Sequence, residues 1–140
     1  MASLNDLAKR MRKLAKEVPE MGNKLAIKVT ITIVNDLAHV TPVDESTAIS
    51  NWQVELNNPA QSAIRAYYPG KKGSTYSLSV SATIDDAKAA LATKKPGQAI
   101  YLSNVLRYIR RLNDGSSSQA PAGYVERSVL LGRLVVRGNI

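Results

Sequence analysis

Apolar residues recur at steps of three and four in the first part of the chain and predict an amphipathic helix over residues 3–16. The apolar stripe consists of Leu4, Leu7, Met11, Leu14 and Val18. Ser3 and Asp6 have the Ser-x-x-Asp arrangement of a helix start, in which the serine oxygen accepts an otherwise unpaired backbone N–H. Pro19 is expected to end this helix or to open the next one. We expect the stripe to pack on its own domain; an extended helix, or packing on a neighbouring subunit, is the alternative for 1–18.

The stretch 20–40 fits two periodicities. Strict alternation of β-branched residues favours a strand and runs through Leu25, Ile27, Val29, Ile31 and Ile33. Helical spacing also fits, through Ala26, Val29, Ile33, Leu37 and Val40. The stretch is longer than the usual ~3–10 residues of a strand, and Thr41-Pro42 ends it, because the residue before a proline is displaced from the helical region. We therefore predict a helix, and a strand remains the alternative for 25–34.

Shorter strands and helices are expected after residue 42. Alternation at 52, 54 and 56 predicts a strand, with Trp52 in the core, and 63–67 can pair with it. A second short strand is predicted at 99–103. A helix is expected to begin at Ser81 or Thr83, with Asp85 and Asp86 in its first turn and two lysines at its end, an arrangement that complements the helix dipole.

Two further helices are predicted near the C-terminus, over 106–112 and over 122–137. The last helix would turn Val125, Val129 and Val136 toward the protein. This order of elements predicts an α+β fold in which a small antiparallel sheet is covered by a long helix and additional helices. The length of 140 residues suits a single domain over 1–140.

Composition narrows the chemistry that is available. The chain has no cysteine, which excludes disulfides, zinc–thiolate sites and cysteine nucleophiles. His39 is the one histidine, so a histidine-rich metal site is excluded as well, and we expect no cofactor and no metal. No apolar run reaches the ~18 residues that a membrane span needs, and the basic N-terminus is unlike a signal peptide. We expect an intracellular or particle-borne protein that does not contact a membrane.

The net charge is +8, from 19 Lys+Arg against 11 Asp+Glu. Such an excess is typical either of a solvated surface or of a protein with a polyanionic partner.

The sequence contains no recognisable arrangement of catalytic residues. Adjacent carboxylates occur at Asp44-Glu45 and Asp85-Asp86, but sequence neighbours do not face each other on a helix. The run 70–74 has the wrong spacing for a phosphate-binding loop. His39 is expected to bond near the end of a helix, and we do not expect an enzyme.

Two stretches of sequence carry a resemblance to a known family. The first, at 39–57, reads HVTPVDESTAISNWQVELN, and the second, at 96–129, reads PGQAIYLSNVLRYIRRLNDGSSSQAPAGYVERSV. Together they resemble the tail-completion or neck protein family of tailed bacteriophages. The second motif is represented by Leu102, Asn104, Tyr108, Leu112, Gly115, Ser117, Gln119, Ala120, Pro121 and Gly123. Two positions depart from the family pattern: Ser46 stands where glycine is usual, and Arg107 where proline is frequent.

The resemblance implies a structural protein of the virion neck, present in the host cytoplasm during assembly. It implies a homo-oligomeric ring, six-fold in symmetry, around the DNA channel between a head-side adaptor or portal ring and the tail proteins. The candidate subunit or partner interface is the polar loop and the stiff segment after it: Asn113, Asp114, Gly115, Ser116, Ser117, Ser118, Gln119, Ala120 and Pro121. The candidate DNA-facing residues, which would hold packaged DNA without reading its sequence, are Arg107, Arg110, Arg111, Lys71 and Lys72. The alternative function is a stand-alone, sequence-independent nucleic-acid-binding module.

Overall fold

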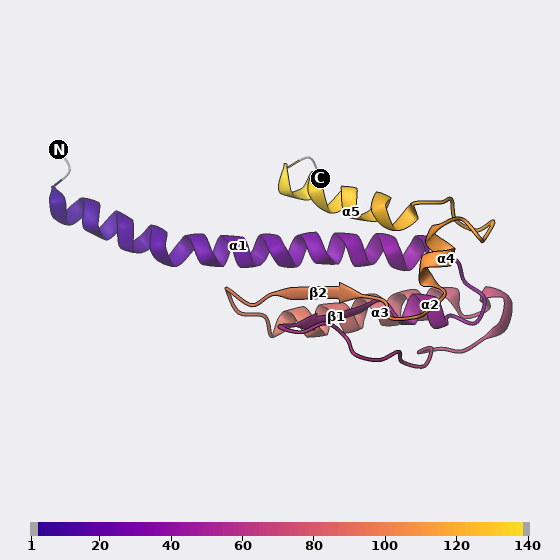
Figure 1. Cartoon of the computed structure of the whole chain (residues 1–140). Coiled ribbons are helices and arrows are strands. Elements are labelled where there is room, and N and C mark those ends of the chain that lie inside the picture. The colour runs from indigo at the N-terminus through magenta and orange to yellow at the C-terminus, as the bar shows by residue number, and fades with distance from the viewer. Residues whose placement is uncertain (1–2, 139–140) are drawn as a thin grey trace.

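One helix, α1 (Leu4–Val40), runs the length of the molecule in the computed structural model, which describes residues 3–138 (Figure 1). Ser3 caps it, since its Oγ accepts from the Asp6 N–H at 3.2 Å and the Asp6 carboxylate accepts from the Ser3 N–H at 3.1 Å. The helical interpretation of 20–40 is therefore confirmed, and the strand alternative is wrong. α1 ends at Val40, with Thr41 as its C-cap in an extended conformation directly before Pro42, as expected.

Pro19 lies inside α1, so the prediction that it would end the helix or begin a new one is wrong. A proline removes one backbone hydrogen bond and costs about 3 kcal/mol inside a helix. The helix nevertheless continues without a break from Leu4 to Val40. Figure 1 shows α1 bending in this N-terminal part, as expected where a proline interrupts the hydrogen-bond ladder.

The remaining elements are short, except α3 and α5. They are α2 (Thr47–Ser50), β1 (Gln53–Leu56), the 3-10 turn η1 (Lys71–Gly73), α3 (Tyr76–Ala92), β2 (Ile100–Ser103), α4 (Ile109–Asn113) and α5 (Tyr124–Val136). The fold is α+β, with a two-stranded antiparallel sheet, a long N-terminal helix and further helices packed around them.

The sheet pairs β1 with β2, in the register Val54 opposite Leu102 and Leu56 opposite Ile100. The prediction that 63–67 would pair with the first strand is therefore wrong. Segment 63–67 is held by a side chain instead: Asn51 accepts from the Ile64 N–H at 2.8 Å and donates to the Ile64 carbonyl at 2.9 Å. The buried Asn51 amide thus takes the place of a strand neighbour.

α3 begins at Tyr76, earlier than the start predicted at Ser81 or Thr83. Thr83 is buried, and its hydroxyl donates to the Ser79 carbonyl at 2.8 Å inside the helix. Asp85 and Asp86 consequently lie within α3 and not in its first turn. A threonine that bonds back to its own helix gives the same sequence signal as one that caps a helix.

α5 packs against α1 through a face that matches the predicted one only at Val125, which is half-buried against the Leu37 and Tyr124 cluster. Val129 and Val136 are 41% and 59% exposed, whereas Tyr124, Ser128, Gly132 and Val135 are buried. A Cβ at Gly132 would lie 2.6 Å from Ile33 Cδ1, so the small residue lets the two helices approach closely. The short distance between α1 and α5, and not hydrophobicity alone, therefore determines which face of α5 is buried.

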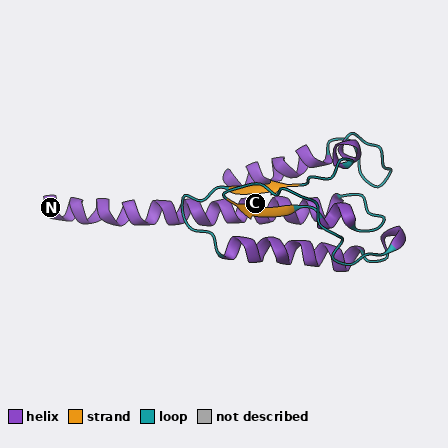
Figure 2. Ribbon diagram, turned by 60° about the horizontal axis from the view of Figure 1, so that its bottom comes forward, coloured by secondary structure: helices purple, strands orange, loops and turns teal. Residues whose placement is uncertain are grey.

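The elements form layers around the second half of α1. Figure 1 shows α5 on one side of α1 and the sheet with α3 on the other, and Figure 2 shows the first half of α1 running on beyond them. One core cluster joins Val34, Val54, Ala87 and Leu91, from α1, β1 and α3. The stripe from Leu4 to Val18 is exposed, so the expectation that it packs on its own domain is wrong. The extended alternative is the arrangement found.

Candidate functional site

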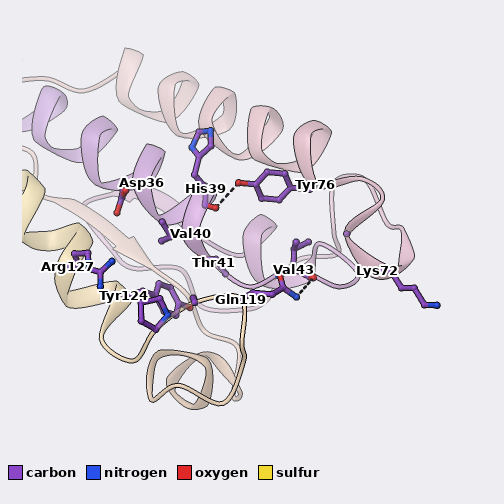
Figure 3. Close-up of a pocket in the computed structure, with 13 residues that line it drawn as sticks. Asp36, His39, Val40, Thr41, Val43, Lys72, Tyr76, Gln119, Tyr124 and Arg127 are labelled. Carbon is purple, nitrogen blue, oxygen red and sulfur yellow. Dashed lines mark hydrogen bonds between the residues drawn. The ribbon is translucent and has the colours of Figure 1, made fainter.

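The two sequence stretches that carry the family resemblance meet at the C-terminal end of α1. We call this region the loop end; it comprises residues 41–47, 70–75 and 113–123. The side chain of Gln119 joins the stretches directly: its Oε1 accepts from the Val43 N–H and its Nε2 donates to the Val43 carbonyl, each at 2.9 Å. Figure 3 shows this pairing beside the end of α1. A side-chain amide therefore forms both bonds that a neighbouring strand would form.

Trp52 lies beneath the loop end, in the core as predicted. Its indole Nε1 donates to Thr41 Oγ1 at 2.8 Å, and that hydroxyl donates to the Leu37 carbonyl at 2.6 Å. The ring packs in one cluster with Leu37, Ala120 and Tyr124. The Ala120 side chain is thus part of the core, and it anchors the segment that follows the polar loop.

Asn113 fixes the start of α5. Its Oδ1 accepts from the Val125 N–H at 2.9 Å, its Nδ2 donates to both Glu126 carboxylate oxygens, and its carbonyl accepts from the Gly123 N–H at 2.7 Å. The hydrogen bond from Asn113 holds the pKa of Glu126 below its usual value. Of the predicted interface, Asn113, Gln119 and Ala120 therefore bond or pack within their own chain.

The exposed part of the predicted interface is the tip of the loop. Asp114, Gly115, Ser116, Ser118 and Pro121 are exposed, and Ser117 is half-buried. Gly115 has a φ of +97°, a left-handed conformation that glycine adopts without strain. The loop is thus held firmly at both ends and presents a short polar surface between them.

Positive backbone angles also occur on the other side of the loop end. Ser46 has φ 68° and is buried, with its Oγ 2.9 Å from Thr75 Oγ1. This is the position at which the family pattern has glycine, the residue best suited to such an angle. Asp44 accepts from the Lys72 N–H at 2.7 Å, and its carbonyl accepts from the Gly73 N–H at 2.8 Å. The turn therefore has a defined shape with a serine at this position.

A surface groove of about 680 Å³ lies between the end of α1, the start of α3 and residues 119–127 (Figure 3). Tyr76 donates to the His39 carbonyl at 2.7 Å, and His39 Nδ1 lies 2.6 Å from the Asn35 carbonyl oxygen. His39 thus bonds within the last turns of α1, in line with its expected role. Asp36, on the same groove, accepts a hydrogen bond from Ser128. The polar side chains of Asp36, His39 and Tyr76 in this groove therefore bond to the chain's own elements.

The predicted DNA-facing residues are all exposed and do not form one continuous basic patch. Arg110 and Arg111 belong to α4 and Arg107 to the turn before it, whereas Lys71 and Lys72 belong to η1. Glu45 lies between the two groups: it lines one groove with Lys71 and another, of about 320 Å³, with Tyr108. Burial and the Glu45 carboxylate raise the pKa of Tyr108. The arginines around α4 and the lysines of η1 are thus two basic surfaces with the Glu45 carboxylate between them.

Sequence reasoning missed several contacts that build the loop end. Asn104 donates to the Ala48 carbonyl at 3.0 Å and accepts from the Leu106 N–H at 3.2 Å. Asn104 belongs to the second stretch that carries the resemblance, but nothing in its local sequence points to Ala48. Pairings between distant segments have no signal in spacing or periodicity.

Comparisons of the chain with protein-family models, curated proteins and solved structures found no match. Within residues 3–138, the structure contains no cluster of three or more His, Asp or Glu side chains able to hold a metal ion. In the same range, no helix combines the length and the apolar character required to span a bilayer.

Proposed function

We propose that this chain is a structural protein of the bacteriophage virion neck, forming a six-fold ring at the head–tail junction around the DNA channel. The observation that carries the proposal is the meeting of the two resembling stretches at the loop end. Gln119 of the second stretch bonds to Val43 of the first, and Ala120 packs with Trp52. The motif residues thus belong to one structural unit, which supports a shared origin with the neck family.

The exposed tip of the loop supports a role in assembly. Residues 114–118 present backbone and hydroxyl groups on a loop that is fixed at both ends by Asn113 and Gln119. A closed ring requires two different patches on each subunit, because each copy meets its neighbours head to tail. In this proposal the loop tip is one of these patches, and the head-side ring and the tail contact the two faces of the assembly.

The test is head–tail joining in phage that lacks this protein. We expect separate full heads and tails by negative-stain electron microscopy, with joining restored by the wild-type chain. Ser118→Arg should abolish this restoration because it places a bulky cation on the loop tip. The control Ser81→Arg makes the same change at an exposed site on α3 and should restore joining. Joined particles without the protein would refute the proposal, and full restoration by Ser118→Arg would exclude this loop as the interface.

A second candidate function is a stand-alone nucleic-acid-binding module, favoured by the exposed arginines 107, 110 and 111 around α4. Such a module would bind DNA as the isolated chain, with an affinity that falls steeply with salt. Replacing one phosphate-contacting arginine, such as Arg110→Gln, should make the negative slope of log association constant against log salt concentration less steep by about 0.9. Weak binding by the isolated chain at physiological salt would favour the ring, in which many subunits surround the same DNA.

A further inference from the structure

An apolar seam runs along the first half of α1 and is largely exposed. It consists of Leu4, Leu7, Met11, Leu14, Val18, Met21 and Leu25. These side chains are between 40% exposed, at Leu25, and 85% exposed, at Leu4. We call this surface the α1 seam. Monomeric proteins seldom leave a contiguous apolar surface of this kind open to water.

The α1 seam has the spacing of a coiled coil. Its steps alternate strictly between three and four residues over three seven-residue repeats, which is the a/d pattern of helices that wrap around each other. α3 and α5 lie along the second half of α1, and Figure 2 shows the first half running beyond them. The spacing therefore favours packing against another helix. Among residues 3–138, no helix lies beside the seam from Leu4 to Val18, and only its last residue, Leu25, borders a groove shared with Val136 of α5.

The two flanks of the α1 seam differ in character. With Leu4, Met11 and Val18 at a positions, the e positions are Ala8, Ala15 and Gly22, all small. The g positions on the other flank include Arg10, Glu17 and Lys24. One flank therefore permits close approach of a second helix, and the other carries charges that select its partner and its direction.

These charges favour a second copy in antiparallel orientation. In a parallel pair, g residues face the partner's e residues, so Arg10 and Glu17 would face alanine or glycine. In an antiparallel pair, g faces g and e faces e. One antiparallel register places Met11 opposite the partner's Leu14. In it Arg10 faces the partner's Glu17, and by symmetry Glu17 faces the partner's Arg10. On the other flank, Ala8 faces the partner's Ala15. Both charged contacts are attractive, and the small flanks meet.

We propose that the α1 seams of two copies pair in this antiparallel register. The contact is two-fold and closes after two copies, whereas a ring uses head-to-tail contacts that involve other surfaces. It therefore goes beyond the proposed neck function and does not depend on it. In this register residues 4–21 of the two copies overlap, about 18 residues or ~27 Å of helix, which is short for a coiled coil. We expect reversible association in the micromolar range.

The first test measures the mass of the full chain by sedimentation equilibrium across a concentration series. We expect a monomer–dimer equilibrium that Leu14→Asp shifts to monomer without loss of helical circular dichroism. Leu78→Asp is the matched control, because Leu78 on α3 is 53% exposed and Leu14 is 56% exposed. A chain that is monomeric throughout, or a dimer weakened equally by both variants, would refute the proposal.

The second test reverses the flanking charges. Arg10→Glu and Glu17→Arg should each weaken the dimer by about tenfold or more, because each replaces two attractive contacts with two repulsive ones. The double variant restores attraction in the antiparallel pair and should recover the wild-type dissociation constant. Lys9→Glu makes the same charge change as Arg10→Glu at an f position, away from the seam, and is the control. Failure of the double variant to recover affinity would refute the antiparallel register.

The third test traps the register directly, since the chain has no cysteine of its own. Mixing Ala8→Cys with Ala15→Cys full-length chains under mild oxidation should give a disulfide-linked dimer containing one of each. Either variant alone should cross-link far more slowly, because identical e positions lie one repeat apart in this register. Equal cross-linking of the single variants would contradict the proposed register.

Discussion

Replacement of Gly132 tests how closely α5 lies on α1. A Cβ at this position would lie 2.6 Å from Ile33 Cδ1, 2.9 Å from Ile33 Cγ1 and 3.2 Å from Val29 Cγ1. The Cδ1 atom can rotate away, but Cγ1 can move only by a change in χ1, which a β-branched residue in a helix resists. Overpacking of this kind costs about 1–3 kcal/mol, against a gain of about 1 kcal/mol in helix propensity for alanine over glycine.

Gly22 supplies the matched control for this prediction. It lies within the same type of helix, and an added Cβ there meets nothing within 4 Å. Gly22→Ala should therefore stabilise the protein by the full propensity gain of about 1 kcal/mol, and Gly132→Ala should be less favourable than Gly22→Ala by about 1–3 kcal/mol. Both free energies of unfolding are measured by urea denaturation at the same protein concentration.

A double-mutant cycle identifies the residue responsible. Ile33→Val removes the nearest of the clashing atoms, so it should be tolerated better in the Gly132→Ala variant than in the wild-type chain, with a coupling of at least about 0.5 kcal/mol. Equal stabilisation by Gly132→Ala and Gly22→Ala would refute the close approach of the two helices. A cycle without coupling would show that Ile33 is not the residue that limits it.

Three further outcomes are expected. Burial and the Asp86 carboxylate raise the pKa of Tyr67 from 10.0 to about 12. The protonated Tyr67 therefore contributes stability that is present below pH 10 and is lost as the pH rises from 10 to about 12. Tyr67→Phe should remove this pH-dependent loss, measured by alkaline denaturation. Thr41→Val leaves the buried Trp52 N–H without its acceptor and should cost about 1–3 kcal/mol in urea unfolding, whereas Thr41→Ser should retain most of the stability. Gly115→Ala places a side chain at φ +97° and should lower thermal stability by about 1–2 kcal/mol; an unchanged melting temperature would contradict the left-handed turn.

Local sequence patterns predicted most helices and both strands of this fold. The stretch 20–40 was assigned as a helix on its length, against the β propensity of its alternating isoleucines. The structure shows how its threonines fit a helix: Thr30 donates to the Ala26 carbonyl and Thr32 to the Lys28 carbonyl, each at 2.8 Å. These bonds are local, so residue type and spacing were sufficient to anticipate the element.

Pairings between distant segments lay beyond the sequence. β1 pairs with β2 and not with 63–67, because the buried Asn51 amide holds that segment in place of a strand. Gln119 and Val43 are 76 residues apart, and neither residue type suggests the other. The buried face of α5 was predicted from its valines. The buried face instead includes Ser128 and Gly132, because α1 lies so close to α5 that small residues are needed at the contact. Each error arose where three-dimensional proximity outweighed local preference.

The proline within α1 has a mechanical consequence. α1 has 37 residues, which corresponds to ~55 Å of helix with the seam in its first half and the loop end at its C-terminus. The hydrogen bond that Pro19 cannot donate makes the helix easier to bend at that point than elsewhere. Bending of α1 is therefore expected mainly at Pro19. The first half of α1 can therefore change its angle to suit a partner while the core around Leu37 and Trp52 keeps its shape.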